Sequence, residues 1–142
     1  MKVIAIIQAR MGSKRLPGKV MKKINGIPLI EYLLLRLSRA KTLDSIIVAT
    51  SDQAENLPLV NFLETKGYNV TSGSEMNVLE RYFTAAKNSE ANAIVRITAD
   101  CPLIDPQIVD DIVKNFKKTN QIILAMLTQE LFQTGLMWKF FQ

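Results

Sequence analysis

The segment from Gln8 to Lys19 contains the densest group of anion-binding side chains in the sequence. It combines four cationic side chains with two glycines and a serine: Arg10, Gly12, Ser13, Lys14, Arg15, Gly18 and Lys19. Glycine allows backbone amides to approach an anion closely, while arginine and lysine neutralise a polyphosphate. The spacing matches neither a Walker A loop nor a GxGxxG dinucleotide motif. A basic turn that binds nothing is the alternative, but packed like charges repel each other unless an anion compensates them.

Two aspartates follow predicted strands. Asp100 comes directly after an apolar run and is followed by Pro102. It could simply cap a turn, but opposite the basic loop it would suit Mg²⁺, which needs few protein ligands because it keeps waters and binds phosphate oxygens. For Asp52, a helix cap or turn residue is the favoured interpretation.

The absence of histidine from the sequence excludes several kinds of catalytic site. Cys101 is the single cysteine, so neither a Cys–His pair nor a Ser–His–Asp triad can form. One cysteine without histidine also cannot provide a usual zinc ligand set.

Charge is distributed unevenly along the chain. The net charge is +5, but residues 1–41 contain ten lysines or arginines and a single acid, Glu31. This asymmetry indicates an anionic partner, either nucleotide phosphates or a nucleic-acid backbone, although a solvated basic surface would look the same. The composition, the lack of an apolar run near 18 residues and the single cysteine predict one soluble domain in a reducing, cytoplasmic setting.

Hydrophobic patterning predicts alternating strands and helices. We expect strands at 2–7, 45–50, 68–70 and 93–98, a loop at 71–76, and helices at 29–40, 56–66, 77–89 and 105–117. Gly67 would end the second helix, and Asp105 would be the N-cap of the fourth, with Pro106 as its first residue. This order predicts a parallel, doubly wound α/β domain.

Parallel α/β sheets bind ligands beyond the carboxyl ends of their strands. The segments predicted at that edge are Gln8 to Lys19, Thr50 to Asp52, Ser72 to Ser74 and Ala99 to Pro102. We therefore expect them to converge on one site.

These segments resemble the cytidylyltransferases that activate sugars as nucleotide conjugates. The first loop is similar to that shared by the 3-deoxy-manno-octulosonate and acylneuraminate enzymes. The branch of spore-coat polysaccharide biosynthesis protein F is most similar, with the further motifs Ala49-Thr50-Ser51-Asp52, Gly73-Ser74-Glu75-x-x-Val78-Leu79-x-Arg81-Tyr82 and Arg96-Ile97-Thr98-Ala99-Asp100-Cys101-Pro102-Leu103-Ile104-Asp105-Pro106. The resemblance covers residues 1 to about 119.

The resemblance implies a Rossmann-like nucleotide-diphospho-sugar transferase fold, here truncated, and transfer of CMP from CTP to a sugar with release of pyrophosphate. Arg10 and Lys19 would be catalytic and Asp100 a Mg²⁺ ligand. The implied nucleotide-binding residues are Gln8, Ala9, Arg10, Gly12, Ser13, Lys14, Lys19, Ser51, Asp52 and Ser74. The implied partners are CTP and a sugar, with no nucleic acid or membrane, and a homodimer is possible.

Residues 120–142 do not resemble the family by eye. The codons for Met137-Trp138-Lys139 encode Val-Glu when they are read in the frame that begins at the third base of each codon. Val-Glu fits the Gly-Leu-Asp-Val-Glu-Val-Phe continuation that the resemblance implies. We therefore expect a nucleotide-binding domain at 1–119 and a frameshifted tail at 120–142. Two alternatives stay open: a nucleotide-binding fragment without turnover, and a nucleic-acid binder, for which the sequence offers no aromatic stacking platform or known motif.

Overall fold

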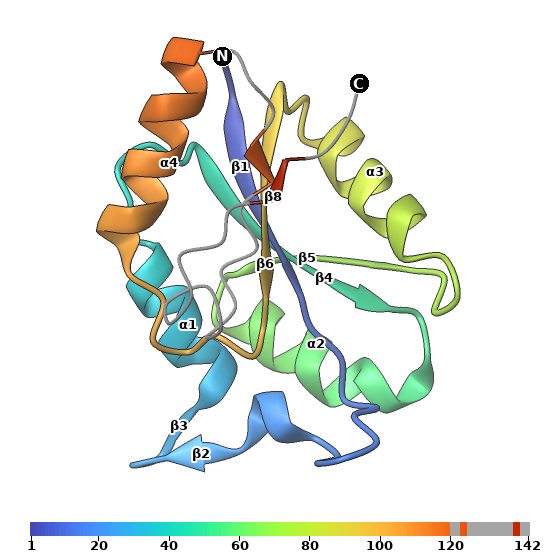
Figure 1. Ribbon diagram of the computed structural model, residues 1–142. Helices are drawn as coiled ribbons and strands as arrows, with labels where there is room; N and C mark the ends of the chain where they lie inside the picture. Colours follow the sequence, from blue (N-terminus) through green and yellow to red (C-terminus); the bar gives the residue numbers. More distant parts are fainter. Residues whose placement is uncertain (120–122, 125–137, 140–142) are drawn as a thin grey trace.

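A four-stranded parallel sheet forms the centre of the molecule in the computed structural model, which describes residues 1–119, 123–124 and 138–139 (Figure 1). The strands are β1 (Val3–Gln8), β4 (Ser45–Ser51), β5 (Asn69–Gly73) and β6 (Ala93–Thr98), in the spatial order β5-β4-β1-β6. The predicted parallel α/β architecture is therefore confirmed.

Helices cover both faces of the sheet (Figure 1). They are α1 (Leu29–Leu37), α2 (Leu57–Thr65), α3 (Val78–Asn88) and α4 (Pro106–Thr119), with 3-10 turns η1 (Lys19–Met21) and η2 (Ala54–Asn56). Buried residues of α1, α2 and α4 pack on one face, whereas those of α3 pack on the other. Two short antiparallel pairs complete the described structure: β2 (Lys23–Ile24) with β3 (Ile27–Pro28), and β7 (Ile123–Leu124) with β8 (Trp138–Lys139).

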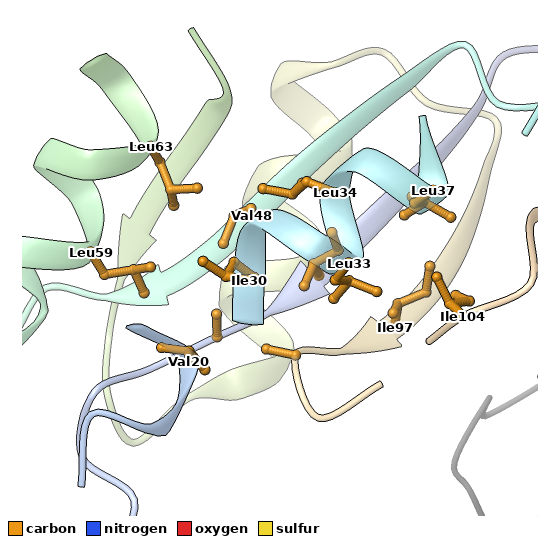
Figure 2. Close-up of a cluster of buried hydrophobic side chains, with 14 of the residues drawn as sticks. Val20, Ile30, Leu33, Leu34, Leu37, Val48, Leu59, Leu63, Ile97 and Ile104 are labelled. Atoms are coloured by element: carbon orange, nitrogen blue, oxygen red, sulfur yellow. The ribbon is translucent and has the colours of Figure 1, made fainter. Parts of the chain in front are cut away.

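The larger core lies between α1 and the sheet (Figure 2). Successive side chains of a strand point to opposite faces, so β1 sends Ala5 and Ile7 into this core and Ile4 and Ile6 toward α3. All four are fully buried. This burial on both faces explains why β1 is a continuous apolar run.

Several local predictions are confirmed at the ends of elements. Asp105 caps α4, since its Oδ1 accepts a hydrogen bond of 2.8 Å from the amide of Gln107, and Pro106 is the first helical residue. Gly67 follows α2 with a φ of 77°, in the left-handed region that glycine adopts readily.

Two features differ from the sequence prediction. Strand β5 continues to Gly73, where a loop from residue 71 was predicted, because its backbone keeps pairing with β4 as far as Ser51. The β2–β3 pair was not predicted; Asn25 and Gly26, both with positive φ, form the turn between its strands.

No helix in the described part of the chain is long and apolar enough to span a membrane. The predicted tail at 120–142 lies outside the described residues except for β7 and β8.

Candidate functional site

The carboxyl ends of the strands gather the four predicted segments along one edge of the sheet (lower part of Figure 1). Strand β1 lies between β4, which follows it in sequence, and β6, which comes later. The chain runs outward from β1 through β4 to β5 and then crosses back to β6 on the other side of β1, and open α/β sheets bind ligands where the strand order reverses in this way. The loop after β1 and Asp100 after β6 therefore lie where the strand order reverses.

The loop after β1 is folded around the carbonyl oxygen of Met11. The amides of Ser13 and Gly18 both donate to it, each at 2.8 Å. Gly18 has a φ of 66°, a conformation that costs glycine little. A Cβ at Gly12 would meet the carboxylate of Glu55, which lies at the end of an exposed, flexible side chain.

The loop meets β6 through an ion pair. Lys19 Nζ lies 2.6 Å from Asp100 Oδ1, and the two side chains are 28% and 57% exposed. Both charges are accessible to solvent and therefore to a charged ligand. The predicted juxtaposition of the basic loop and Asp100 is present in the structure.

The loop also reaches across the sheet to the segment after β5. Arg10 Nη1 donates to Glu75 Oε1 at 2.7 Å. Glu75 is held in turn by Arg81, whose Nη1 donates to the carbonyl oxygens of Ser74 and, at 3.1 Å, Glu75. The influence of Ser51, and after it that of Arg10, lowers the pKa of Glu75, although partial desolvation acts to raise it. The lowered pKa favours the carboxylate form of Glu75.

A buried asparagine attaches the loop to β4. Asn56 is only 1% exposed. Its Oδ1 accepts from the amide of Met11 at 2.8 Å, and its Nδ2 donates to Ser51 Oγ at 2.6 Å. Ser51 is itself buried at the end of β4, so its hydroxyl faces protein groups.

The other predicted nucleotide-binding residues lie along the same edge. Gln8 ends β1 and pairs with both neighbouring strands, and buried Ala9 continues the pairing through its amide, which donates to Ala49 O at 3.1 Å. Ser13 Oγ accepts weakly from the amide of Leu16, and Lys14 is exposed.

The remaining two predicted residues lie near β5. The amide of exposed Asp52 donates to Gly73 O at 2.8 Å. Ser74 Oγ accepts from the amide of Asn77 at 3.2 Å, just before α3. Asp52 Oδ1 also accepts from Gln53 Nε2 at 3.2 Å, so both side chains have neighbouring residues as partners in this structure.

The sequence predicts no functional role for three residues of the site. Glu75 and Arg81 belong to the motif that runs from Gly73 to Tyr82, and their opposite charges beside the predicted edge of the sheet could have indicated a role there. Asn56 is predicted from the sequence only as the first residue of a helix, and no local pattern distinguishes it because the tertiary fold determines both of its partners.

Asp100 is the carboxylate that the sequence predicts as a metal ligand, and it lies beside Lys19 of the loop. Among the described residues, no cluster of three or more His, Cys, Asp or Glu side chains could hold a metal on its own. A Mg²⁺ ion would therefore depend on phosphate oxygens and water beside Asp100, which is how Mg²⁺ is commonly bound. Burial raises the pKa of the Cys101 thiol, which agrees with the prediction that it is not a nucleophile.

Several known proteins are similar to this chain in sequence and in fold. A family model described as "Cytidylyltransferase" matches residues 4–136, and so extends beyond residue 119, where the resemblance in the sequence motifs ends. The Bacillus subtilis spore coat polysaccharide biosynthesis protein SpsF is 36% identical over 112 residues, covering 76% of this chain and 47% of that protein. The 3-deoxy-manno-octulosonate cytidylyltransferase of Fusobacterium nucleatum is 34% identical over 133 residues, covering 92% of this chain and 53% of that enzyme.

A solved structure agrees with these matches. A cytidylyltransferase from Leptospira borgpetersenii superposes with a TM-score of 0.79 at 37% identity, covering 84% of this chain and 50% of that one. The chain spans about half the length of the curated relatives it matches.

Proposed function

Because this chain belongs to the cytidylyltransferase family, we propose that it forms the nucleotide-binding part of an enzyme that transfers CMP from CTP to a sugar and releases pyrophosphate. The sugar nucleotide would serve surface or spore-coat polysaccharide synthesis, as the name of the B. subtilis relative suggests. The observation that carries the proposal is the placement of Lys19 against Asp100 where the strand order reverses, with Arg10 on the same loop.

In this proposal the loop binds the triphosphate. Lys19 and Arg10 neutralise phosphate charge, and the guanidinium of Arg10 has N–H groups left for phosphate oxygens while Nη1 stays on Glu75. Loop amides near Gly12 can approach the phosphates because glycine has no side chain of its own. Gln8, Ala9, Ser13, Lys14, Asp52 and Ser74 would complete the nucleotide site.

The reaction is a displacement at the α-phosphorus. An oxygen of the sugar bonds to that phosphorus as the bond to the bridging oxygen breaks, pyrophosphate leaves, and the sugar hydroxyl proton passes to solvent. The residues of this chain hold the triphosphate in line and stabilise the charge that develops on pyrophosphate. Asp100 would bind a Mg²⁺ ion, which when present neutralises phosphate charge.

A nucleotide-binding fragment without turnover is the second candidate. Titration calorimetry with CTP and Mg²⁺, beside a pyrophosphate-release assay with 3-deoxy-manno-octulosonate and other acidic sugars, separates the candidates. Binding with release supports the enzyme, whereas binding alone supports the fragment.

Charge variants make the binding assay specific for the site. Lys19→Ala should weaken CTP binding at least about tenfold, because a cation in contact with phosphate is lost. Lys23→Ala removes the same charge from exposed β2 and serves as the matched control. Binding to DNA but not to CTP, or equal losses in the two variants, would rule out both candidates.

A further inference from the structure

Asn56 lies at the N-terminus of α2, but its side chain does not cap that helix. Asparagine is a preferred N-cap residue, because its carbonyl oxygen can accept from the free amides of the first turn. Within the described part of the chain, the side chain of Asn56 makes no such capping hydrogen bond, although the residue is only 1% exposed. Its Oδ1 instead accepts from the amide of Met11 at 2.8 Å, and its Nδ2 donates to Ser51 Oγ at 2.6 Å. The side chain therefore supports the loop after β1 and not its own helix.

The orientation of the Asn56 amide is determined by Met11. A backbone N–H needs an acceptor, so the carbonyl oxygen of Asn56 must face Met11 and its Nδ2 must then face Ser51. A hydroxyl can accept as well as donate, so Ser51 fits this orientation. Rotation of the side chain would break both hydrogen bonds at a buried position, which is unfavourable. Asn56 is therefore held in one position between the loop and β4.

Met11 connects Asn56 with the rest of the loop. Its carbonyl oxygen accepts from the amides of Ser13 and Gly18, each at 2.8 Å, and its side chain packs against the larger core. Gly18 is the N-cap of η1, whose first residue is Lys19. Hydrogen bonds at both peptide groups of Met11 thus link the buried Asn56 to the segment that presents Lys19.

We propose that Asn56 is a positioning residue that holds the loop from Arg10 to Lys19 in its polyphosphate-binding conformation before the ligand binds. The inference rests on the proposed function, in which this loop binds the triphosphate. Ordering a loop on binding has a free-energy cost, which is avoided when the loop is ordered in advance. The four cationic side chains of the loop repel one another in the absence of an anion. Asn56 opposes this repulsion through a hydrogen bond that adds no negative charge beside the phosphates.

Hydrogen exchange of the Met11 amide, measured by nuclear magnetic resonance on the full chain without ligand, tests the attachment. We expect this amide to be protected in the wild type. Asn56→Leu removes both hydrogen bonds with little change in volume and should accelerate its exchange at least about tenfold. Asn56→Asp keeps an acceptor for Met11 and can accept from the Ser51 hydroxyl, so it should restore protection. Equal exchange rates in these two variants would overturn the proposal.

A second substitution keeps the exchange experiment decisive. Asn56→Ala removes the same hydrogen bonds and replaces Asn56→Leu if that variant does not fold. If neither variant folded, Asn56 would be required for the fold itself, and the positioning role would be overturned. Only exchange is compared for Asn56→Asp, because its added negative charge would itself repel phosphates.

Binding of CTP and of inorganic triphosphate, each with Mg²⁺, tests the consequence by titration calorimetry. Asn56→Leu should weaken binding of both about three- to tenfold, because the loop is no longer ordered in advance. Asn61→Leu, the same substitution at an exposed position of α2, is the matched control and should leave binding unchanged. Unchanged affinity in Asn56→Leu, despite fast exchange of the Met11 amide, would overturn the positioning role. If the wild type bound neither ligand but showed the expected exchange pattern, the proposed function would fail and the ordering of the loop by Asn56 would stand.

Discussion

The substitution Asp100→Asn should change CTP binding in opposite directions with and without Mg²⁺. In this structure the carboxylate neutralises Lys19, with 2.6 Å between Nζ and Oδ1. Without metal, Asp100 forms an ion pair with Lys19 and repels the phosphates, so removal of its negative charge should strengthen CTP binding. With Mg²⁺, the substitution removes the carboxylate that would bind the ion, so binding should weaken.

The size of each effect follows from the exposure of the pair. Exposed ion pairs stabilise a protein by roughly 0.2–1 kcal/mol, and Asp100 is 57% exposed. Freeing Lys19 should therefore increase CTP affinity up to about fivefold in EDTA. Loss of a metal ligand should lower affinity in Mg²⁺ at least about tenfold. The free energy of unfolding should change by less than about 1 kcal/mol.

Titration calorimetry with CTP in EDTA and in excess Mg²⁺ measures both effects on the same preparations. Asp111→Asn provides the charge-matched control, because Asp111 is an exposed aspartate on α4 whose contacts are with Lys114 at 3.6 Å and Gln107 at 2.9 Å on the same helix. The reasoning fails if Asp100→Asn weakens binding equally in both solutions. It also fails if the gain in affinity caused by Mg²⁺ is as large in the variant as in the wild type.

Three further predictions concern stability and the coding sequence. Burial acts to raise the pKa of Asp110, but hydrogen bonds from Lys41 and Thr42 outweigh it and lower the pKa. Asp110→Asn should therefore lower the free energy of unfolding by roughly 2–3 kcal/mol at pH 7. This difference should begin to shrink below about pH 3.9, the pKa of an unfolded aspartate, and be lost as pH falls through the lower pKa of the folded state. Urea unfolding across pH checks it, and a difference independent of pH would contradict it. Leu33→Ala should cost about 2–5 kcal/mol in the same assay because Leu33 is fully buried, and a loss below 1 kcal/mol would show that the core can collapse around the gap. Sequencing the coding DNA should reveal a second frame that encodes Val-Glu across Met137-Trp138-Lys139 within a continuation of the family sequence, and its absence would refute the frameshifted tail.

Local sequence was sufficient for the elements themselves and for the basic loop. Ile4, Ile6 and Ile7 form an apolar run that only a strand buried on both faces accommodates. Asp105 and Pro106 specify the start of α4 because capping involves only residues within one turn. Such signals depend on neighbours in the chain and can be recognised without the fold.

The partners of the loop were decided by the tertiary structure. The sequence order of the strands does not state that β1 lies between β4 and β6, yet this arrangement places Asp100 beside Lys19. The pairing of Arg10 with Glu75 joins residues 65 positions apart.

The basic loop therefore remains the feature on which sequence and structure agree, while its supports were found only in the fold. Asn56 and Ser51 have ordinary local surroundings in the sequence, and their role arises because β4 ends where the loop turns back. A hydrogen bond requires two groups within about 3 Å in the right orientation, and only the packed sheet brings groups so distant in sequence to that separation.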